Sequence, residues 1–500
     1  MDVFANLATG FGAALSFTNI GFALIGCLLG TLIGVLPGIG PIPAIAMLLP
    51  ITFGLDPLAS LIMLAGIYYG AQYGGSTTSI LVNMPGEAAS IVTCIDGHQM
   101  ARQGKGGLAL ATSALGSFFA GCVGTVFVAA FGPLLAAFAQ EFNSPDYFSL
   151  MLLGLVTAVM LAHGSVLKAL GMVFVGLLLG IVGTDVNSGV QRFTFHQTFI
   201  FDGIDFLPLV LGLFGIVEIV RNLELPEPPR MLISAKFRDL FPKLRDLKPA
   251  VMPALRGTAL GALLGILPGG GAVLAAFASY TMEKKIAKDP SRFGKGAIEG
   301  VAGPESANNA AAQTSFIPLL TLGLPSNAVM ALMMGAMMIM GLQPGAAVID
   351  KRPDLFWGMT ASMWIGNLML LVLNLPLIGI WVKLLSVPYR LLYPAILLFC
   401  AVGVYASNTT AAQLVLMAGF AVFGYVLYKF GCEPAPLVLG FILGPLMEEN
   451  LRRSLVLSRG DPYILIDRPI SATLLSVTAI MLVVMILPQI RRKREEAFQE

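Results

Sequence analysis

Neutral polar side chains that could bind an ion or a carboxylate gather at two places in an otherwise apolar chain. The first group comprises Ser76, Thr77, Thr78, Ser79 and Asn83, and the second comprises Asn308, Asn309, Thr314, Ser315, Ser326 and Asn327. Such groups inside a membrane can also serve only to join helices. Both groups, however, lie beside a proline break, Pro85-Gly86 in the first and Pro325 in the second. We therefore predict that they line a substrate site.

Carboxylates accompany these hydroxyls and amides. Glu305 lies just before Asn308, and Glu87 follows Pro85-Gly86, in stretches without lysine or arginine. An ionisable residue inside a membrane protein is by default a functional candidate, as a proton carrier or a cation ligand. We predict that Glu305 and Glu87 hold the coupling ion. The alternative is that they lie in water at the rim of a vestibule, which we also consider for Glu299.

A duplicated motif organises the chain around these groups. Gly26 to Pro41 reads GCLLGTLIGVLPGIGP, and 231 positions later Gly257 to Gly271 reads GTALGALLGILPGGG. Glycine at every fourth position lets helices approach closely in lipid, and the Pro-Gly pair ends a helix within an apolar run. Broken helices at matching places in two halves are a pointer to a transporter's binding site. We predict two re-entrant hairpins whose tips bind substrate, with these tip residues: Pro37, Gly38, Gly40, Pro268, Gly269 and Gly270.

The composition identifies a membrane protein with many crossings. Of 500 residues 56% are hydrophobic and 12% are charged, and the mean hydropathy is +0.83. Basic residues crowd a few short segments: Arg102 to Lys105, Arg221 to Arg256, Lys284 to Lys295 and Arg491 to Arg494. The positive-inside rule places these segments, and with them the C-terminus, in the cytoplasm. Arg452, Arg453, Arg459 and Arg468 conflict with this scheme, because it places them outside.

The duplication sets the predicted domain organisation. The pentapeptide PLVLG also occurs twice, at 208–212 and 436–440, and the loops after the two hairpins differ in charge, which indicates opposite orientation. We predict an all-α polytopic protein with two inverted repeats, broken helices and ten to twelve crossings. The first repeat covers 1–223, a cytoplasmic linker 224–253, the second repeat 254–452, and a last transmembrane helix with a basic tail 453–500.

Two other classes of function remain open. A passive channel would show the same polar lining but would need no ion gradient. An intramembrane enzyme would need a clustered acid/base pair or a metal set, whereas His98, His163 and His196 lie far apart and no catalytic or metal motif occurs. We expect no enzyme activity, no metal, no cofactor besides a coupling cation, and no nucleic-acid partner.

The stretches from Tyr73 to Gly107 and from Glu299 to Asn327, which contain DGHQMARQG and PESANNAA, resemble the tripartite tricarboxylate transporter family, specifically its large membrane subunit, TctA. The resemblance implies uptake of citrate-like carboxylates across the bacterial inner membrane, driven by Na⁺ or H⁺. It also implies two partners, a small membrane subunit (TctB-like) and a periplasmic solute-binding protein (TctC-like). The family's motif residues fall on Pro37 to Pro41, Gly74 to Thr78, Asn83, Pro85, Pro304, Glu305, Asn308 and Asn309.

Overall fold

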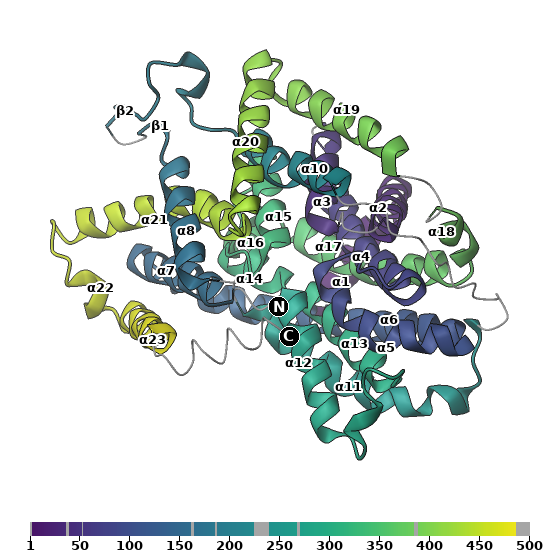
Figure 1. The fold of residues 1–500 in the computed structure, drawn as a ribbon. Coiled ribbons are helices and arrows are strands. Elements are labelled where there is room, and N and C mark those ends of the chain that lie inside the picture. The colour runs from purple at the N-terminus through teal and green to yellow at the C-terminus, as the bar shows by residue number, and fades with distance from the viewer. Residues whose placement is uncertain are drawn as a thin grey trace.

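The computed structural model describes residues 3–36, 40–52, 54–161, 165–185, 188–224, 240–267, 271–384 and 389–486. These parts of the chain are almost entirely helical, with one small β-hairpin of β1 (Gly183–Thr184) and β2 (Gln191–Arg192) (Figure 1). The all-α class predicted from the sequence is therefore confirmed.

The first half contains α1 (Val3–Ala14), α2 (Phe17–Val35), α3 (Pro41–Leu48), α4 (Pro57–Val82), α5 (Ile91–Met100), α6 (Gly106–Ala139), α7 (Ser144–Leu161), α8 (Val166–Gly180), α9 (Phe206–Val210) and α10 (Val217–Glu224). The second half contains α11 (Leu244–Ile266), α12 (Gly271–Ile286), α13 (Glu299–Thr314), α14 (Phe316–Leu322), α15 (Ala328–Ile339), α16 (Ala346–Lys351), α17 (Pro353–Asn374), α18 (Ile378–Leu384), α19 (Tyr389–Asn408), α20 (Ala411–Lys429), α21 (Ala435–Leu457), α22 (Ile464–Asp467) and α23 (Pro469–Ile486). Two π-helical segments, Ala101–Lys105 and Leu211–Ile216, join α5 to α6 and α9 to α10.

Six helical segments in the described ranges are long and apolar enough to cross a membrane. They are Phe17–Val35, Ala88–Ala139, Phe206–Glu224, Leu244–Ile266, Pro353–Asn374 and Ala411–Lys429. Shorter apolar helices such as α7, α8, α15 and α23 accompany them. The predicted count of ten to twelve crossings requires several of these shorter helices to cross the membrane as well, so the count stays a prediction. The six long segments support the polytopic class.

The glycines of the duplicated motif pack one helix backbone directly onto another. Gly30 of α2 lies so close to the carbonyl of Ile67 in α4 that no Cβ would fit, and Gly26 and Gly34 do the same one turn away. In the second half, Gly261 of α11 lies equally close to the carbonyl of Ala307 in α13. The residue numbers rise together along each pair, so α2 runs parallel to α4, and α11 runs parallel to α13.

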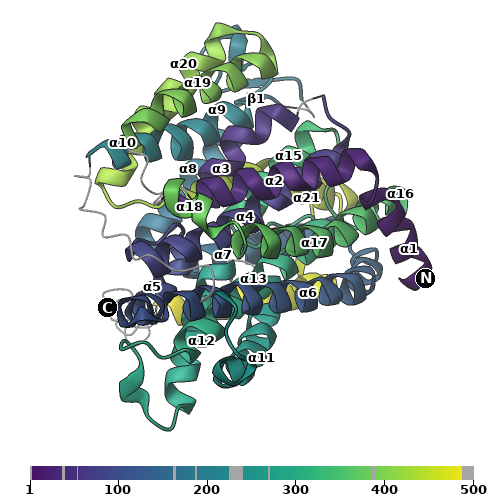
Figure 2. The same ribbon diagram turned by 90° about the vertical axis from the view of Figure 1, so that its right-hand side faces the viewer.

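The two helix pairs meet in opposite directions. Near the C-terminal end of α4, Ser76 contacts Glu305 of α13, whereas earlier in α4 the ring of Tyr69 packs on that of Phe316 in α14, with 6.1 Å between centroids. Residue numbers fall along α4 as they rise from α13 to α14, so α4 is antiparallel to both of these helices. In Figure 2, α2 and α17 lie on one side of α6, and α11 and α12 lie on the other.

The polar stretch after Tyr73 begins inside a continuous helix, because α4 runs unbroken to Val82. The Thr77 hydroxyl donates to the carbonyl of Tyr73, four residues earlier, and the single Ser76 hydroxyl hydrogen is shared between the carbonyl of Gln72 and Glu305. These side chains therefore satisfy their polar groups without breaking the helix. The break comes later, at Asn83, which has a left-handed conformation with φ of 59°.

The region predicted as a linker is partly helical. Helix α11 begins at Leu244, so it takes up residues 244–253, although Pro249 and Pro253 lie inside it. Residues 225–239 of the predicted linker lie outside the described ranges. The first arm of the second hairpin is thus 23 residues long, which is enough to span a membrane, instead of the shorter arm predicted to begin at Ala254.

Three of the four arginines that conflicted with the charge rule, Arg452, Arg453 and Arg468, form ion pairs with acidic side chains. Arg452 pairs with Asp185 at 2.9 Å, and Arg468 pairs with Asp146 at 2.8 Å and donates to the carbonyl of Glu141 at 3.2 Å. Glu141 follows the C-terminal end of α6. The N-terminal end of α6 comes directly after the basic turn that finishes at Lys105. Each of these two cations is locally compensated, so the surrounding region gains little net positive charge.

Candidate ion and substrate site

A buried carboxylate lies between the two halves, held by hydroxyls from three helices. Glu305 is 1% exposed, and its Oε2 accepts hydrogen bonds from Ser76 of α4 at 2.7 Å, Ser113 of α6 at 3.0 Å and Ser117 of α6 at 3.4 Å. Its Oε1 accepts from Thr93 of α5. Removing a carboxylate from water is costly unless it is hydrogen-bonded, and here four donors supply that compensation.

The same face of α13 carries two asparagines beside this carboxylate. The Asn308 Nδ2 donates to Glu87 Oε1 at 3.0 Å, and the Asn309 Nδ2 donates to Ser117 at 2.7 Å. Positions 305, 308 and 309 share one side of a helix, so the PESANNAA motif presents its polar groups together. The side-chain carbonyl oxygens of Asn308 and Asn309 are buried and accept no hydrogen bond in the described structure.

The two breaks after α4 and α14 are equivalent, with an offset of 240 positions. Asn83 and Gly323 both end a helix in the left-handed conformation, and Glu87 and Asn327 both cap the next helical element with an extended backbone. The spacing of Thr-Ser pairs to proline, six residues in one half and ten in the other, hides this equivalence. Glu87 of the first half and Asn327 of the second half therefore occupy equivalent positions.

Each break also meets the hairpin of its own half. Gly40, the residue before α3, lies next to Glu87, and Gly271 at the start of α12 lies next to Asn327. Both glycines have positive φ, 64° and 53°, a conformation that glycine adopts without strain. The predicted tip residues that precede these glycines, Pro37, Gly38, Pro268, Gly269 and Gly270, lie outside the described ranges.

A second polar cluster surrounds Asn327. Tyr68 lies near the side chains of Ser315, Asn327 and Gln72 and near the carboxylate of Glu87. Gln72 is fully buried, and within the described part of the chain neither atom of its amide has a hydrogen-bond partner; the Asn327 Nδ2 also has none there. The Asn327 Oδ1 accepts from the backbone N–H of Met330 at 2.9 Å. This cluster offers amide and hydroxyl donors without a carboxylate of its own.

The other predicted site residues have mainly local partners. Thr78 donates to the carbonyl of Val35 at the end of α2, at 2.7 Å, and Ser79 is buried without a partner. Gly86 packs against Gly34 and Gly75, while Asn83 and Pro85 are exposed. In the second half, Thr314, Ser315 and Ser326 donate to backbone carbonyls, and Pro325 is buried.

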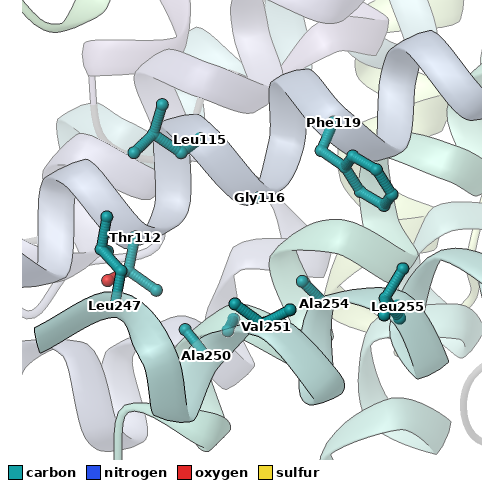
Figure 3. A pocket seen from close by; sticks show the side chains of 10 residues that line it. Thr112, Leu115, Gly116, Phe119, Leu247, Ala250, Val251, Ala254 and Leu255 are labelled. Atoms are coloured by element: carbon teal, nitrogen blue, oxygen red, sulfur yellow. The ribbon is translucent and has the colours of Figure 1, made fainter. Parts of the chain in front are cut away.

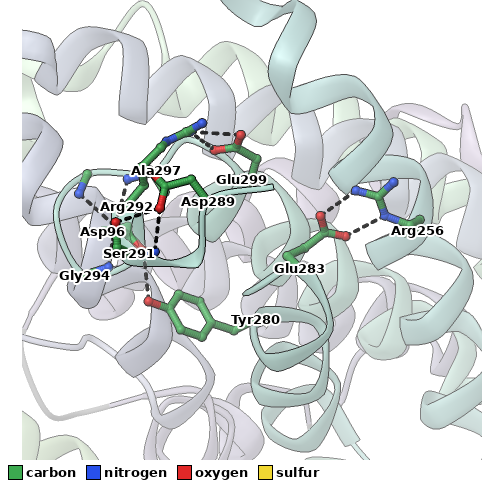
Figure 4. A network of polar contacts seen from close by, with 11 residues as sticks. Asp96, Arg256, Tyr280, Glu283, Asp289, Ser291, Arg292, Gly294, Ala297 and Glu299 are labelled. Carbon is green, nitrogen blue, oxygen red and sulfur yellow. Dashed lines mark hydrogen bonds and ion pairs between the residues drawn. The ribbon is translucent and has the colours of Figure 1, made fainter. Parts of the chain in front are cut away.

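A polar network outside the centre explains two further features of the sequence. Asp96 accepts hydrogen bonds from the backbone N–H groups of Gly294, Gly296 and Ala297 at 2.8 to 2.9 Å and from the Tyr280 hydroxyl at 2.9 Å (Figure 4). It thereby joins α5 to the basic loop of the second half. Glu299 pairs with Arg292 at the surface, so it does not join Glu305 and Glu87.

The described structure also contains an apolar groove of about 230 Å³ between α6 and α11 (Figure 3). Its lining includes Leu115, Phe119, Val251 and Leu255, with Thr112 as the polar side chain. An apolar wall gives a carboxylate no donors, so we place this groove outside the candidate site. In the described ranges no group of three or more His, Cys, Asp or Glu could hold a metal ion.

The family is decided by comparison over most of the chain. The model of the tripartite tricarboxylate transporter TctA family matches residues 20–439. The chain belongs to this family. It is thus related to the membrane subunits of a transporter family, and the matched range includes both breaks and every described candidate residue.

This TctA-family chain is also similar to two proteins of Agrobacterium vitis. One, described as an uncharacterized 52.8 kDa protein in the TAR-I ttuC' 3' region, is 57% identical over 500 residues, which cover 100% of this chain and 99% of that protein. The other, an uncharacterized protein in the TAR-II ttuC' 3' region, is 58% identical over 240 residues, or 48% of this chain and 99% of that protein. No solved structure matches.

Sequence reasoning missed several members of both clusters. Thr93, Ser113 and Ser117 each bind Glu305, yet each is an ordinary small residue within an apolar helix. Gln72 carried a usable signal, because an amide is costly in a long apolar stretch and needs a reason to be there. Tyr68 carried none, since tyrosine is common in membrane helices.

Proposed function

We propose that this chain is the large membrane subunit of a binding-protein-dependent secondary transporter that imports tricarboxylates or related carboxylates by cation symport. It acts in the bacterial inner membrane together with a small membrane subunit and a periplasmic solute-binding protein. Membership of the tripartite family supports this assembly. The C-terminus lies in the cytoplasm, as the basic tail favours.

The observation that carries the proposal is the buried carboxylate between antiparallel halves. Glu305 is contributed by one half, and its hydroxyl donors Ser76 and Ser113 by the other. Relative movement of the two halves therefore changes the coordination of Glu305. A group whose environment changes with conformation can couple the binding of a cation to that change.

The cation is Na⁺ or H⁺, and the oxygen atoms at the centre suit both. The carboxylates of Glu305 and Glu87 and the Asn308 carbonyl oxygen are hard ligands of the kind that alkali and alkaline-earth cations prefer. A proton would instead reside on one of the carboxylates. Ser76, Thr93, Ser113 and Ser117 can reorient in either case, because a hydroxyl both donates and accepts.

The test is uptake into proteoliposomes that contain the chain and its small partner. Radiolabelled citrate, malate, succinate and tartrate are supplied with and without the cognate binding protein, under an imposed Na⁺ or H⁺ gradient. Accumulation that needs both the gradient and the binding protein supports the proposal and identifies the cation. Equilibration that needs neither would mean a passive channel, and chemically altered substrate recovered from the vesicles would mean an enzyme.

A further inference from the structure

The equivalent breaks of the two halves end in residues of unlike charge. Glu87 follows the first break and Asn327 the second, at the same position relative to the left-handed residue and the proline. Each is placed to cap the helical element that follows it. The two positions therefore share a backbone geometry but differ by one negative charge.

The neighbours of the two positions differ in the same sense. Around Glu87 the unpaired groups are acceptors: the Asn308 Oδ1 has no partner, and the Glu305 carboxylate lies near enough to interact electrostatically with Glu87. Around Asn327 three groups can donate, namely the Nδ2 of Asn327 itself, the Nε2 of Gln72 and the hydroxyl of Tyr68, and the Gln72 Oε1 is an unpaired acceptor in the described ranges. Acceptors with negative charge suit a cation, and neutral donors suit an anion.

We infer that Asn327, Gln72 and Tyr68 form a subsite for a carboxylate group of the substrate, separate from the cation site at Glu87 and Glu305. This inference rests on the proposed function. The N-terminus of α15, which begins directly after Asn327, adds a positive partial charge to the same place. Amide and hydroxyl donors at a helix N-terminus bind a carboxylate without lysine or arginine.

The buried, unpartnered atoms are the second and independent support. A buried amide without hydrogen bonds is costly, and Gln72 is fully buried with both amide atoms unpaired by any residue of the described ranges. A carboxylate accepts from several donors at once. Binding of one to Gln72 Nε2, Asn327 Nδ2 and Tyr68 would satisfy these donors, although not the Gln72 Oε1, so the free energy of pairing the donors becomes available for substrate binding.

The experiment exchanges the charges of the two breaks in the complex with its small partner. Asn327→Asp adds a carboxylate to the proposed anion subsite and keeps the helix cap, because aspartate caps as well as asparagine. Glu87→Gln removes the charge at the equivalent position. Asn450→Asp, on α21 near its C-terminal end, is the matched control, since the Asn450 side chain donates to the carbonyl of Leu446 on the same helix. Apparent melting temperatures report whether each variant folds.

The readouts are the substrate KM at saturating cation and the cation concentration for half-maximal uptake at saturating substrate. The probe is the carboxylate that the unsubstituted complex accumulates fastest among citrate, malate, succinate and tartrate. We expect Asn327→Asp to raise the substrate KM at least tenfold and to change the cation constant less than threefold. Glu87→Gln should do the reverse, and Asn450→Asp should change neither constant.

The outcomes separate the inference from the proposed function. If the unsubstituted complex shows no gradient-driven accumulation, the proposed function fails, and the subsite falls with it. If that complex transports but a folded Asn327→Asp variant keeps the original KM, the subsite is refuted and the transport function stands. The same holds if both variants shift the same constant. A raised KM for Gln72→Leu and for Tyr68→Phe would extend the support to the other two donors.

Discussion

The Ser76 hydroxyl donates a hydrogen bond of 2.7 Å to the Glu305 carboxylate, although the two residues are 229 positions apart in the chain. Ser76 lies on α4 of the first half and Glu305 on α13 of the second. This contact is therefore made only when the halves are together. One polar residue from each repeat therefore contributes to the same buried site.

Replacement of Glu305 by glutamine should stop ion-driven transport without unfolding the protein. The amide has the same size, but it has a single acceptor oxygen and no charge, so it cannot receive all four hydroxyls. Hydrogen bonds to charged groups contribute about 1.5–3 kcal/mol each. We expect gradient-driven uptake to fall at least tenfold, measured in the proteoliposome assay.

Glu299→Gln is the control for this change, because Glu299 lies on the same helix and pairs with Arg292 at the surface. Exposed ion pairs contribute about 0–1 kcal/mol, so this variant should transport normally. Normal uptake and normal ion dependence in a folded Glu305→Gln variant would refute the role of Glu305 in coupling.

Replacement of Gly30 by alanine should destabilise the protein, since a Cβ there would overlap the Ile67 backbone. Overpacking costs about 1–3 kcal/mol, and we expect the apparent melting temperature in detergent to fall by a few degrees. Gly21→Ala, on the same helix, meets nothing within 4 Å and should be neutral or slightly stabilising. Equal melting temperatures for the two variants would argue against the close packing of α2 on α4.

Replacement of Asp96 by alanine should loosen the basic loop that precedes α13. Three backbone N–H groups lose their acceptor, and a buried donor without a partner costs about 1–3 kcal/mol. We expect faster hydrogen exchange at Gly294, Gly296 and Ala297. Asp289→Ala removes the two exposed hydrogen bonds from the N–H and the hydroxyl of Ser291, so exchange at the other three positions should stay slow. Unchanged protection in Asp96→Ala would show that other contacts hold the loop.

The ends of α6 should lie on opposite sides of the membrane. With 34 residues at 1.5 Å per residue, this helix is about 50 Å long. At its start, Gln103 binds the carbonyl of Lys295, and at its end Arg468 binds that of Glu141. In intact spheroplasts, a membrane-impermeant maleimide should label Asp467→Cys and should label Lys288→Cys only after permeabilisation. The unsubstituted chain serves as the control for labelling of native cysteines. Labelling of both variants from the same side of the membrane would contradict this topology.

The sequence predicts the helices well where apolar length decides them. The apolar runs at 107–138, 411–428 and 470–487 coincide with α6, α20 and α23, within two residues at each end. It predicts poorly where polar residues are satisfied inside a helix, as at Ser76 and Thr77. There the hydroxyls bond to their own helix, a geometry that composition does not reveal.

The candidate site could be predicted only in part, because a site between two halves depends on their pairing. Glu305 and Asn308 are recognisable as polar residues of one helix face, and Glu87 as a charge beside a break. Their mutual contacts follow from the antiparallel approach of α4 and α13, which juxtaposes residues more than 200 positions apart. The predicted substrate role of the hydroxyls and hairpin tips stays a prediction.

The glycine contacts of α2 with α4 and of α11 with α13 determine where the protein can move. Because the backbones touch without intervening side chains, a small shift within either pair would bring main-chain atoms into collision, whereas hydroxyl to carboxylate contacts can be broken and remade. We expect each pair to behave as one rigid body and all relative motion to occur between the pairs. A coupling cation at Glu305, as we propose, would then lie between the two rigid pairs, and its binding or release would change how easily the pairs move relative to each other.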